Sequence, residues 1–137
     1  MAWRYGPGVA EEHVKPSEGV PSLKALNFYS SVYHGSILAR KKTCTIRLGD
    51  KTDKYREGDI VLVTFGNRFE PRRELFQAVL DQVEVKPVSA LSLRDIGGEN
   101  PDMRRTEDVC AFLSKIYGRD ITPDEVVTVI YFSEISD

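Results

Sequence analysis

The spacing of its apolar segments most constrains what this chain can fold into. Runs typical of β-strands, several of them rich in β-branched residues, occur at about 43–48, 60–65, 74–85 and 126–132. The loops between the first three runs are too short for the helical crossovers that parallel neighbours require. We therefore expect a mixed or mainly antiparallel sheet of the α+β class.

Two further segments carry apolar residues at helical spacing. One runs from about Tyr29 to Ala39, after a brief strand-like pattern at 23–28. The other runs from Thr106 to Tyr117, where Thr106 suits the N-cap position and Gly118 suits the residue after the helix. A capping-box pattern at Thr122–Glu125 lies immediately before the last strand, so it predicts a single helical turn.

The remaining features predict one domain at residues 23–137, preceded by an irregular tail at residues 1–22. A length of 137 residues is typical of one domain with its own core, and the tail is rich in glycine and proline. No apolar run approaches the ~20 residues of a membrane span, and the start lacks the apolar region of a signal peptide. We therefore expect a cytoplasmic protein without a membrane partner.

The two cysteines, Cys44 and Cys110, lie far apart in the sequence and form no CxxC pair. They are predicted to be reduced, partly buried thiols. Only His13 and His34 could join them in a zinc site, and none of the four has ligand spacing. The sequence therefore predicts no metal site and no cofactor.

Positive charge is concentrated between Arg40 and Arg56. This segment holds seven of the nineteen basic residues against Asp50 and Asp53, about +5 in a chain whose net charge is −2. Such a local field selects a small anionic partner, whereas coating long nucleic acid needs many phosphate contacts. The candidate RNA- or ligand-binding residues are Arg40, Lys41, Lys42, Thr45, Arg47, Lys51, Lys54 and Arg56.

Several of these residues also have a purely structural interpretation. Arg47 suits bidentate recognition of a phosphate or base edge, and equally an internal salt bridge. Lys51, Lys54 and Arg56 either extend a phosphate track or form a solvated loop, and Tyr55 either stacks on a base or lies half-buried in the sheet. A second basic group, which the sequence cannot place, comprises Arg68, Arg72 and Arg73.

The segment from Ile37 to Arg47, Ile-Leu-Ala-Arg-Lys-Lys-Thr-Cys-Thr-Ile-Arg, resembles the signature of the ASCH family. These proteins are small β-barrels related in fold to the PUA domains of RNA-modifying proteins. Lys42, Thr45 and Arg47 match three positions of the family pattern, whereas Arg40 stands where the family has glycine. The resemblance extends to Tyr55–Val61 and implies a small PUA-like mixed or antiparallel β-barrel with two main flanking helices.

The resemblance also implies a function. The family fold has a cleft proposed to bind RNA or a nucleobase, so the preferred hypothesis is an RNA- or nucleotide-binding protein. Some bacterial members that resemble this chain more closely are amidohydrolases that remove acetate from N4-acetylcytidine. Their lysine, threonine and glutamate correspond here to Lys42, Thr45 and Glu99.

Under this alternative, Lys42 is the base or nucleophile, Thr45 orients the substrate or donates to the oxyanion, and Glu99 shuttles a proton. In the structural interpretation, Lys42 pairs with a phosphate or carboxylate and Glu99 caps a turn after Gly97 and Gly98. A protein-interaction module is the third hypothesis. The sequence leaves enzymatic activity and the oligomeric state open.

Overall fold

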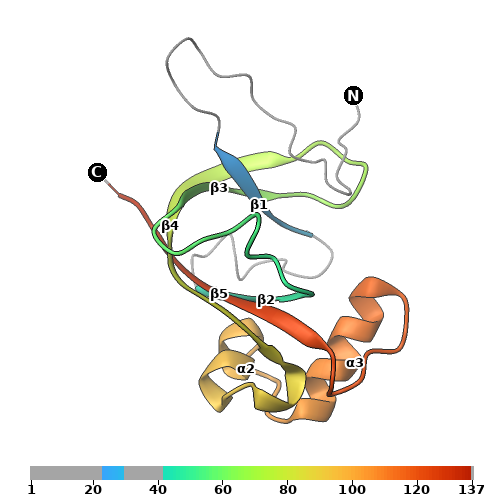
Figure 1. Cartoon of the computed structure of the whole chain (residues 1–137). Coiled ribbons are helices and arrows are strands. Elements are labelled where there is room, and N and C mark those ends of the chain that lie inside the picture. The colour runs from blue at the N-terminus through green and yellow to red at the C-terminus, as the bar shows by residue number, and fades with distance from the viewer. Residues whose placement is uncertain (1–22, 30–41, 137) are drawn as a thin grey trace. The chain divides into compact units, whose positions relative to one another are not determined.

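The computed structural model describes residues 23–29 and 42–136 (Figure 1). These residues fall into two compact units. Unit 1 comprises the described residues 23–29, 59–79 and 133–136, and unit 2 comprises residues 42–58 and 80–132. Five strands hydrogen-bond in the order β1-β3-β4-β5-β2, and β4 passes through both units.

Unit 1 is built on β1 (Lys24–Phe28), β3 (Ile60–Phe65) and the first half of β4 (Arg73–Pro87). β1 pairs with β3 in parallel, and β3 pairs with β4 antiparallel, with a register shift between Val63 and Thr64. Alternate residues point to opposite faces of a strand, so each strand contributes every second side chain to the interior. The fully or almost fully buried apolar residues of this unit are Leu26, Phe28, Val61, Val63 and Ala78.

In unit 2, β2 (Cys44–Leu48) pairs antiparallel with β5 (Val126–Glu134), and Ile46 lies opposite Val129. The short 3-10 helix η1 (Val88–Ala90) follows β4, and α2 (Leu93–Glu99) and α3 (Thr106–Tyr117) follow it. Figure 1 shows both α-helices on one side of the β2–β5 pair. Their shared core contains Cys44, Ile46, Val88, Ile96, Val109, Leu113, Val127 and Val129.

The strands and the helix α3 lie where the sequence predicts them, but α2 was not predicted. Its start carries a capping box: Ser92 Oγ accepts the Asp95 N–H, and Asp95 Oδ2 accepts the Ser92 N–H, both at 3.0 Å. Gly97 and Gly98 within the helix hide this signal, because glycine disfavours helix interiors. Glu99 is therefore the last residue of a helix and does not cap a turn.

The predicted end of α3 is confirmed and its predicted N-cap is wrong. Gly118 ends the helix in the left-handed conformation, at φ 72°. The N-cap residue is Arg105, and Thr106 is the first helical residue. The Asp108 carboxylate accepts the backbone N–H groups of Arg104 and Arg105, each at 3.0 Å, which replaces the expected threonine cap.

The helix predicted at Tyr29–Ala39 falls almost entirely outside the described residues, as do Arg40 and Lys41. Thr122–Glu125 forms a hydrogen-bonded turn, closed by the Glu125 N–H on the Thr122 carbonyl at 3.1 Å, and not a helix. No helix in the described part of the chain is long and apolar enough to cross a membrane.

Candidate functional site

A buried ion pair joins two of the predicted site residues. Lys42 Nζ lies 2.9 Å from Glu99 Oε2 and donates a second hydrogen bond of 2.7 Å to the Glu99 carbonyl oxygen. The side chain of Lys42 is 2% exposed and that of Glu99 is fully buried. Two hydrogen bonds of the Lys42 ammonium thus fix the last residue of α2 to the chain two residues before β2.

The second carboxylate oxygen of Glu99 binds the backbone of β2. The backbone groups of the odd-numbered residues in this stretch form the hydrogen bonds to β5. Phe132 N donates to the Thr43 carbonyl and Gly49 N donates to the Val126 carbonyl. The Ile46 N–H therefore points to the outer edge of the strand, where Glu99 Oε1 accepts it at 2.7 Å. Glu99 both neutralises Lys42 and satisfies an edge donor that would otherwise be buried without a partner.

Burial in this arrangement disfavours the charged form of Lys42. Desolvation by burial lowers the pKa of the Lys42 ammonium, and the attraction and hydrogen bond of Glu99 offset only part of this effect. A lysine with a lowered pKa is the form that general-base or nucleophilic chemistry requires. Ion-pair networks that only stabilise a fold also shift pKa values, so the shift is consistent with both interpretations.

The position of Glu99 depends on close packing of α2 against β2. A Cβ atom added to Gly98 would lie 2.8 Å from the Cβ of Cys44 and 3.2 Å from its sulfur, so only glycine allows this approach. Gly97, its neighbour, faces open space. Burial raises the pKa of the Cys44 thiol to about 12, so this cysteine is a core residue rather than a nucleophile.

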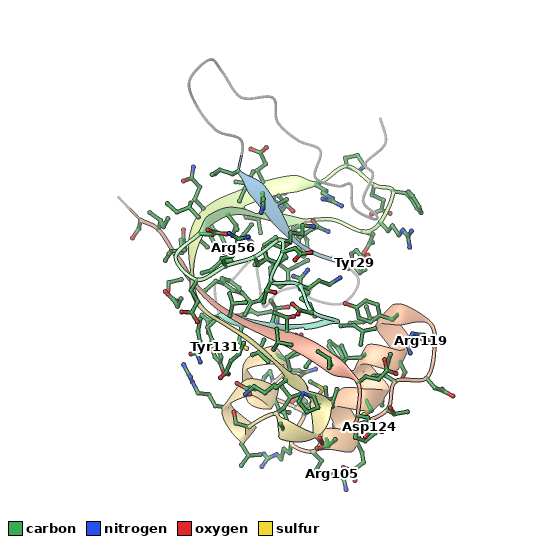
Figure 2. The ribbon with its side chains drawn as sticks, in the orientation of Figure 1. Tyr29, Arg56, Arg105, Arg119, Asp124 and Tyr131 are labelled. Atoms are coloured by element: carbon green, nitrogen blue, oxygen red, sulfur yellow. The ribbon has the colours of Figure 1, made fainter. Side chains whose placement is uncertain are left out.

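A second polar network, which the sequence does not predict, holds the start of α2. Asp95 accepts hydrogen bonds from Tyr131 Oη at 2.6 Å and from Lys86 Nζ at 2.8 Å. Figure 2 shows Tyr131 on β5, and the Arg94 guanidinium lies 4.1 Å from the centre of its ring. Burial alone would raise the pKa of Asp95, but the hydrogen bonds of Lys86, Tyr131 and Ser92 lower it overall. The S-x-x-D capping pattern was the one available sequence signal for this aspartate.

Thr45 and Arg47 form a separate pair. Side chains alternate along β2, so these two lie on the opposite face from Cys44 and Ile46. Arg47 Nε donates to Thr45 Oγ1 at 3.0 Å, and Thr45 is fully buried while Arg47 is half-buried. The structure thus brings Lys42 to Glu99, and Thr45 to Arg47, and the two pairs are coupled because the charge of Arg47 contributes to the lowered pKa of Lys42.

The basic loop at residues 49–58 is tied to β5 beside Arg47. Thr128, which lies opposite Arg47 in the strand register, accepts the Lys51 N–H at 2.9 Å and donates to the Gly49 carbonyl at 2.6 Å. Lys51 O accepts the N–H of Tyr55, a residue that is only 4% exposed. Tyr55 is therefore buried in the loop, and not half-buried in the sheet as the structural interpretation expected. Figure 2 labels Arg56 on this loop, which also carries Lys51 and Lys54.

Among the residues that the structure describes, no three His, Cys, Asp or Glu side chains lie close enough together to hold a metal ion. The site offers instead a buried lysine–glutamate pair, a threonine–arginine pair and a basic loop, all within unit 2. Such groups can bind an anion, polarise a carbonyl or exchange a proton.

Comparisons with known proteins support the fold. No protein-family model and no curated protein matches the sequence. The structure is similar to the ASCH domain from Lactobacillus crispatus JV V101, with a TM-score of 0.54 and 14% identity, over 77% of this chain and 71% of that one. It is also similar to protein EF3133 from Enterococcus faecalis V583, of the family-model DUF984, with a TM-score of 0.52 and 17% identity, over 73% and 67% of the two chains.

These likenesses identify the class of fold. The chain has an ASCH-like, PUA-like fold of the α+β class, as the motif around Lys42, Thr45 and Arg47 predicts. At such identities the likeness concerns the fold and not the activity.

Proposed function

We propose that this chain is an RNA- or nucleotide-binding protein of ASCH-like fold that acts in the cytoplasm. Its ligand would place a phosphate or base edge against Arg47, with Lys51, Lys54 and Arg56 attracting the negative charge around it.

The observation that carries this proposal is the attachment of the basic loop beside Arg47. Thr128 binds both Gly49 and Lys51 directly across from Arg47 in the register, so cations separated in the sequence share one part of unit 2. Arg47 Nε is also held by Thr45, which restricts the guanidinium before any ligand binds. Such preorganisation reduces the entropy that an ordered arginine loses on binding.

Fluorescence anisotropy with a labelled single-stranded RNA of about ten nucleotides tests the proposal over a series of KCl concentrations. We expect the affinity to fall as salt rises, and Arg47→Gln to weaken binding about tenfold or more with a shallower salt dependence. Lys115→Gln on α3 is the matched control, because it removes an exposed positive charge outside the site. Binding that is insensitive to salt, or equal effects of the two variants, would exclude this site.

Hydrolysis of an N4-acylated cytosine nucleoside is the second candidate, and the Lys42–Glu99 pair favours it. Neutral Lys42 would take a proton from water as the water oxygen adds to the acyl carbon, and Thr45 would donate to the oxyanion. Because Thr45 Oγ1 already accepts from Arg47, its own proton is the one available for donation. As the C–N bond breaks, the proton held by Lys42 would pass through Glu99 to the leaving amine, which gives cytidine and acetic acid. Acetic acid then ionises to acetate and releases its proton to water. Substrate must reach a lysine whose side chain is 2% exposed, so we place this activity second.

Incubation with N4-acetylcytidine, with cytidine followed by chromatography, tests this candidate. We expect Glu99→Gln to reduce turnover at least a hundredfold, as is usual for loss of a general acid or base. Lys86→Gln is the control, since Lys86 pairs with the other buried carboxylate of α2. Absence of turnover above buffer, or equal activity of the two variants, excludes the hydrolase. A chain that binds neither RNA nor nucleoside leaves the third hypothesis, a protein-interaction module.

A further inference from the structure

The loop between β3 and β4 in unit 1 presents an aromatic side chain to solvent. Phe69 is 77% exposed, more than any other large apolar residue in the described part of the chain. Among the described residues it is also the one non-glycine residue with a positive φ, 67°. Exposure and a left-handed backbone are both unfavourable for a phenylalanine, and strain of this kind is concentrated at functional sites.

The loop that carries Phe69 is anchored at its base. The Gly66 N–H donates to the Phe28 carbonyl and the Gly66 carbonyl accepts from Asn27 Nδ2, both at 3.0 Å. A Cβ at Gly66 would lie 2.8 Å from the Pro71 carbonyl oxygen, so glycine allows the two ends of the loop to meet. These contacts to β1 hold the base of the loop that presents Phe69.

The charges around Phe69 define the kind of partner that it suits. The Arg68 guanidinium lies 4.8 Å from the centre of the ring, as in a cation–π contact. Arg72 is half-buried, and burial lowers its pKa to about 10, which leaves it charged at neutral pH. Arg73 follows at the start of β4, and the acidic residues nearby are Glu70 and Glu74. An exposed ring with a surplus of arginines fits a partner that has both π-faces and negative charge.

We propose that this loop, residues 66–73, is a stacking site for an unpaired base of a single-stranded nucleic acid, with Phe69 under the base and the arginines at the adjacent phosphates. A lipid surface fits less well, because the loop offers a single large exposed apolar side chain and carries Glu70 beside it. This proposal extends the proposed RNA binding to a second surface, and it does not depend on Arg47.

The test uses the full chain, a fluorescein-labelled single-stranded RNA of about ten nucleotides, and the DNA of the same sequence. We expect Phe69→Leu and Phe69→Ala to weaken binding about 5- to 150-fold, and Phe69→Trp to retain it, because stacking needs a π-face and not merely an apolar side chain. Arg72→Gln should instead reduce the salt dependence. The ratio of the affinities for RNA and DNA then shows which of the two nucleic acids the loop prefers.

Phe69→Gly separates a stacking role from a structural one. Glycine accepts the left-handed backbone without strain, so this variant should bind RNA more weakly while its Tm rises. A fall in both binding and Tm would mean that the loop itself is lost, and would overturn the proposal.

Other outcomes also decide. RNA binding that depends on Arg47 but is unchanged in Phe69→Leu and Phe69→Ala overturns the stacking site and leaves the proposed function standing. Binding that depends on Phe69 but not on Arg47 does the reverse. Attachment of the chain to phosphatidylserine vesicles, lost in Phe69→Ala, with no effect on RNA, assigns the loop to a lipid surface and overturns the proposal.

Discussion

Helix α2 carries a buried carboxylate near each of its ends, and the two are neutralised in different ways. Asp95, near the start, binds Lys86, whose side chain is 20% exposed, together with Tyr131 and the Ser92 N–H. Glu99, at the end, binds Lys42, whose side chain is 2% exposed. The pKa of Lys86 is raised, chiefly by its hydrogen bond to Asp95, whereas desolvation lowers the pKa of Lys42.

The burial of each lysine decides the direction in which its pKa shifts. Water still solvates Lys86, so the charge of Asp95 adds to its stability as a cation. Lys42 has lost that solvation, and one carboxylate does not replace it. The pair at the start of α2 therefore stabilises the charged form of its lysine. In the pair at the end of α2, the charged form of the lysine is unfavourable, which is the property that general-base chemistry requires.

The largest predicted difference is between the two lysine deletions. Lys42→Met leaves Glu99 buried without its cation and should reduce the free energy of unfolding by about 3–5 kcal/mol. Lys86→Met should cost only about 1 kcal/mol, because Tyr131 and Ser92 still bind Asp95. Urea unfolding of both variants measures the difference.

A double variant sharpens this test. Lys42→Met with Glu99→Gln retains an oxygen for the Ile46 N–H and removes the unpaired charge, so it should recover part of the lost stability. Equal losses for Lys42→Met and Lys86→Met would show that the two pairs do not differ as their burial indicates.

A glycine pair inside α2 gives the next effect. Gly98→Ala places a methyl group against Cys44 and should destabilise the protein by about 1–3 kcal/mol. Gly97→Ala is the matched control: its new Cβ meets nothing within 4 Å, so it should be neutral or stabilise the helix by up to about 1 kcal/mol. Thermal unfolding of the two variants decides, and a loss in both would mean that helix backbone and not α2–β2 packing is responsible.

The fold was largely accessible from the sequence because its strands are β-branched runs separated by short loops. The end of α3 was predicted correctly because its apolar spacing and Gly118 agree, whereas its N-cap is Arg105 and not Thr106. α2 was missed because tertiary packing, the approach of Gly98 to Cys44, requires a glycine that local propensity counts against a helix.

The site was accessible only in part. The motif identified Lys42, Thr45 and Arg47, and the resemblance supplied Glu99, which does reach Lys42. Asp95, Lys86 and Tyr131 come from three different elements and share no motif, so only the folded chain brings them together. Strand alternation predicts that Thr45 lies on the opposite face of β2 from Cys44 and Ile46. Which residues pack against each face could be learned only from the structure.

The two carboxylate pairs should also respond to pH in different ranges. The folded-state pKa of Asp95 is lowered, so its stabilisation is present above the pKa of about 3.9 of the unfolded chain and is lost as pH falls further. The folded-state pKa of Lys42 is also lowered, so the unfolded state binds the proton more tightly. Its contribution to stability therefore increases as pH rises from the folded-state value toward 10.5.

Subtracting the stability of Asp95→Asn and of Lys42→Met from that of the wild type, at each pH, isolates the two contributions. The Asp95 difference should shrink in acid and the Lys42 difference should grow in base. A Lys42 contribution that is constant from pH 7 to 10.5 would show that Glu99 fully compensates the lost solvation.

The smallest effect concerns Cys44, which reports whether the interior beside α2 is closed to water. Its pKa of about 12 leaves very little thiolate at pH 8, whereas an ordinary thiol with a pKa near 8.5 is substantially ionised. Burial raises the pKa of Cys110 as well, but this cysteine is half-exposed whereas Cys44 is fully buried. Iodoacetamide should therefore modify Cys110 well before Cys44, and mass spectrometry of the peptides measures both rates. In urea the two rates should become similar. Rapid modification of folded Cys44 would mean that solvent reaches the face of β2 that packs against α2. Water would then also reach the Lys42–Glu99 pair, and this pair would not be more strongly desolvated than the Lys86–Asp95 pair.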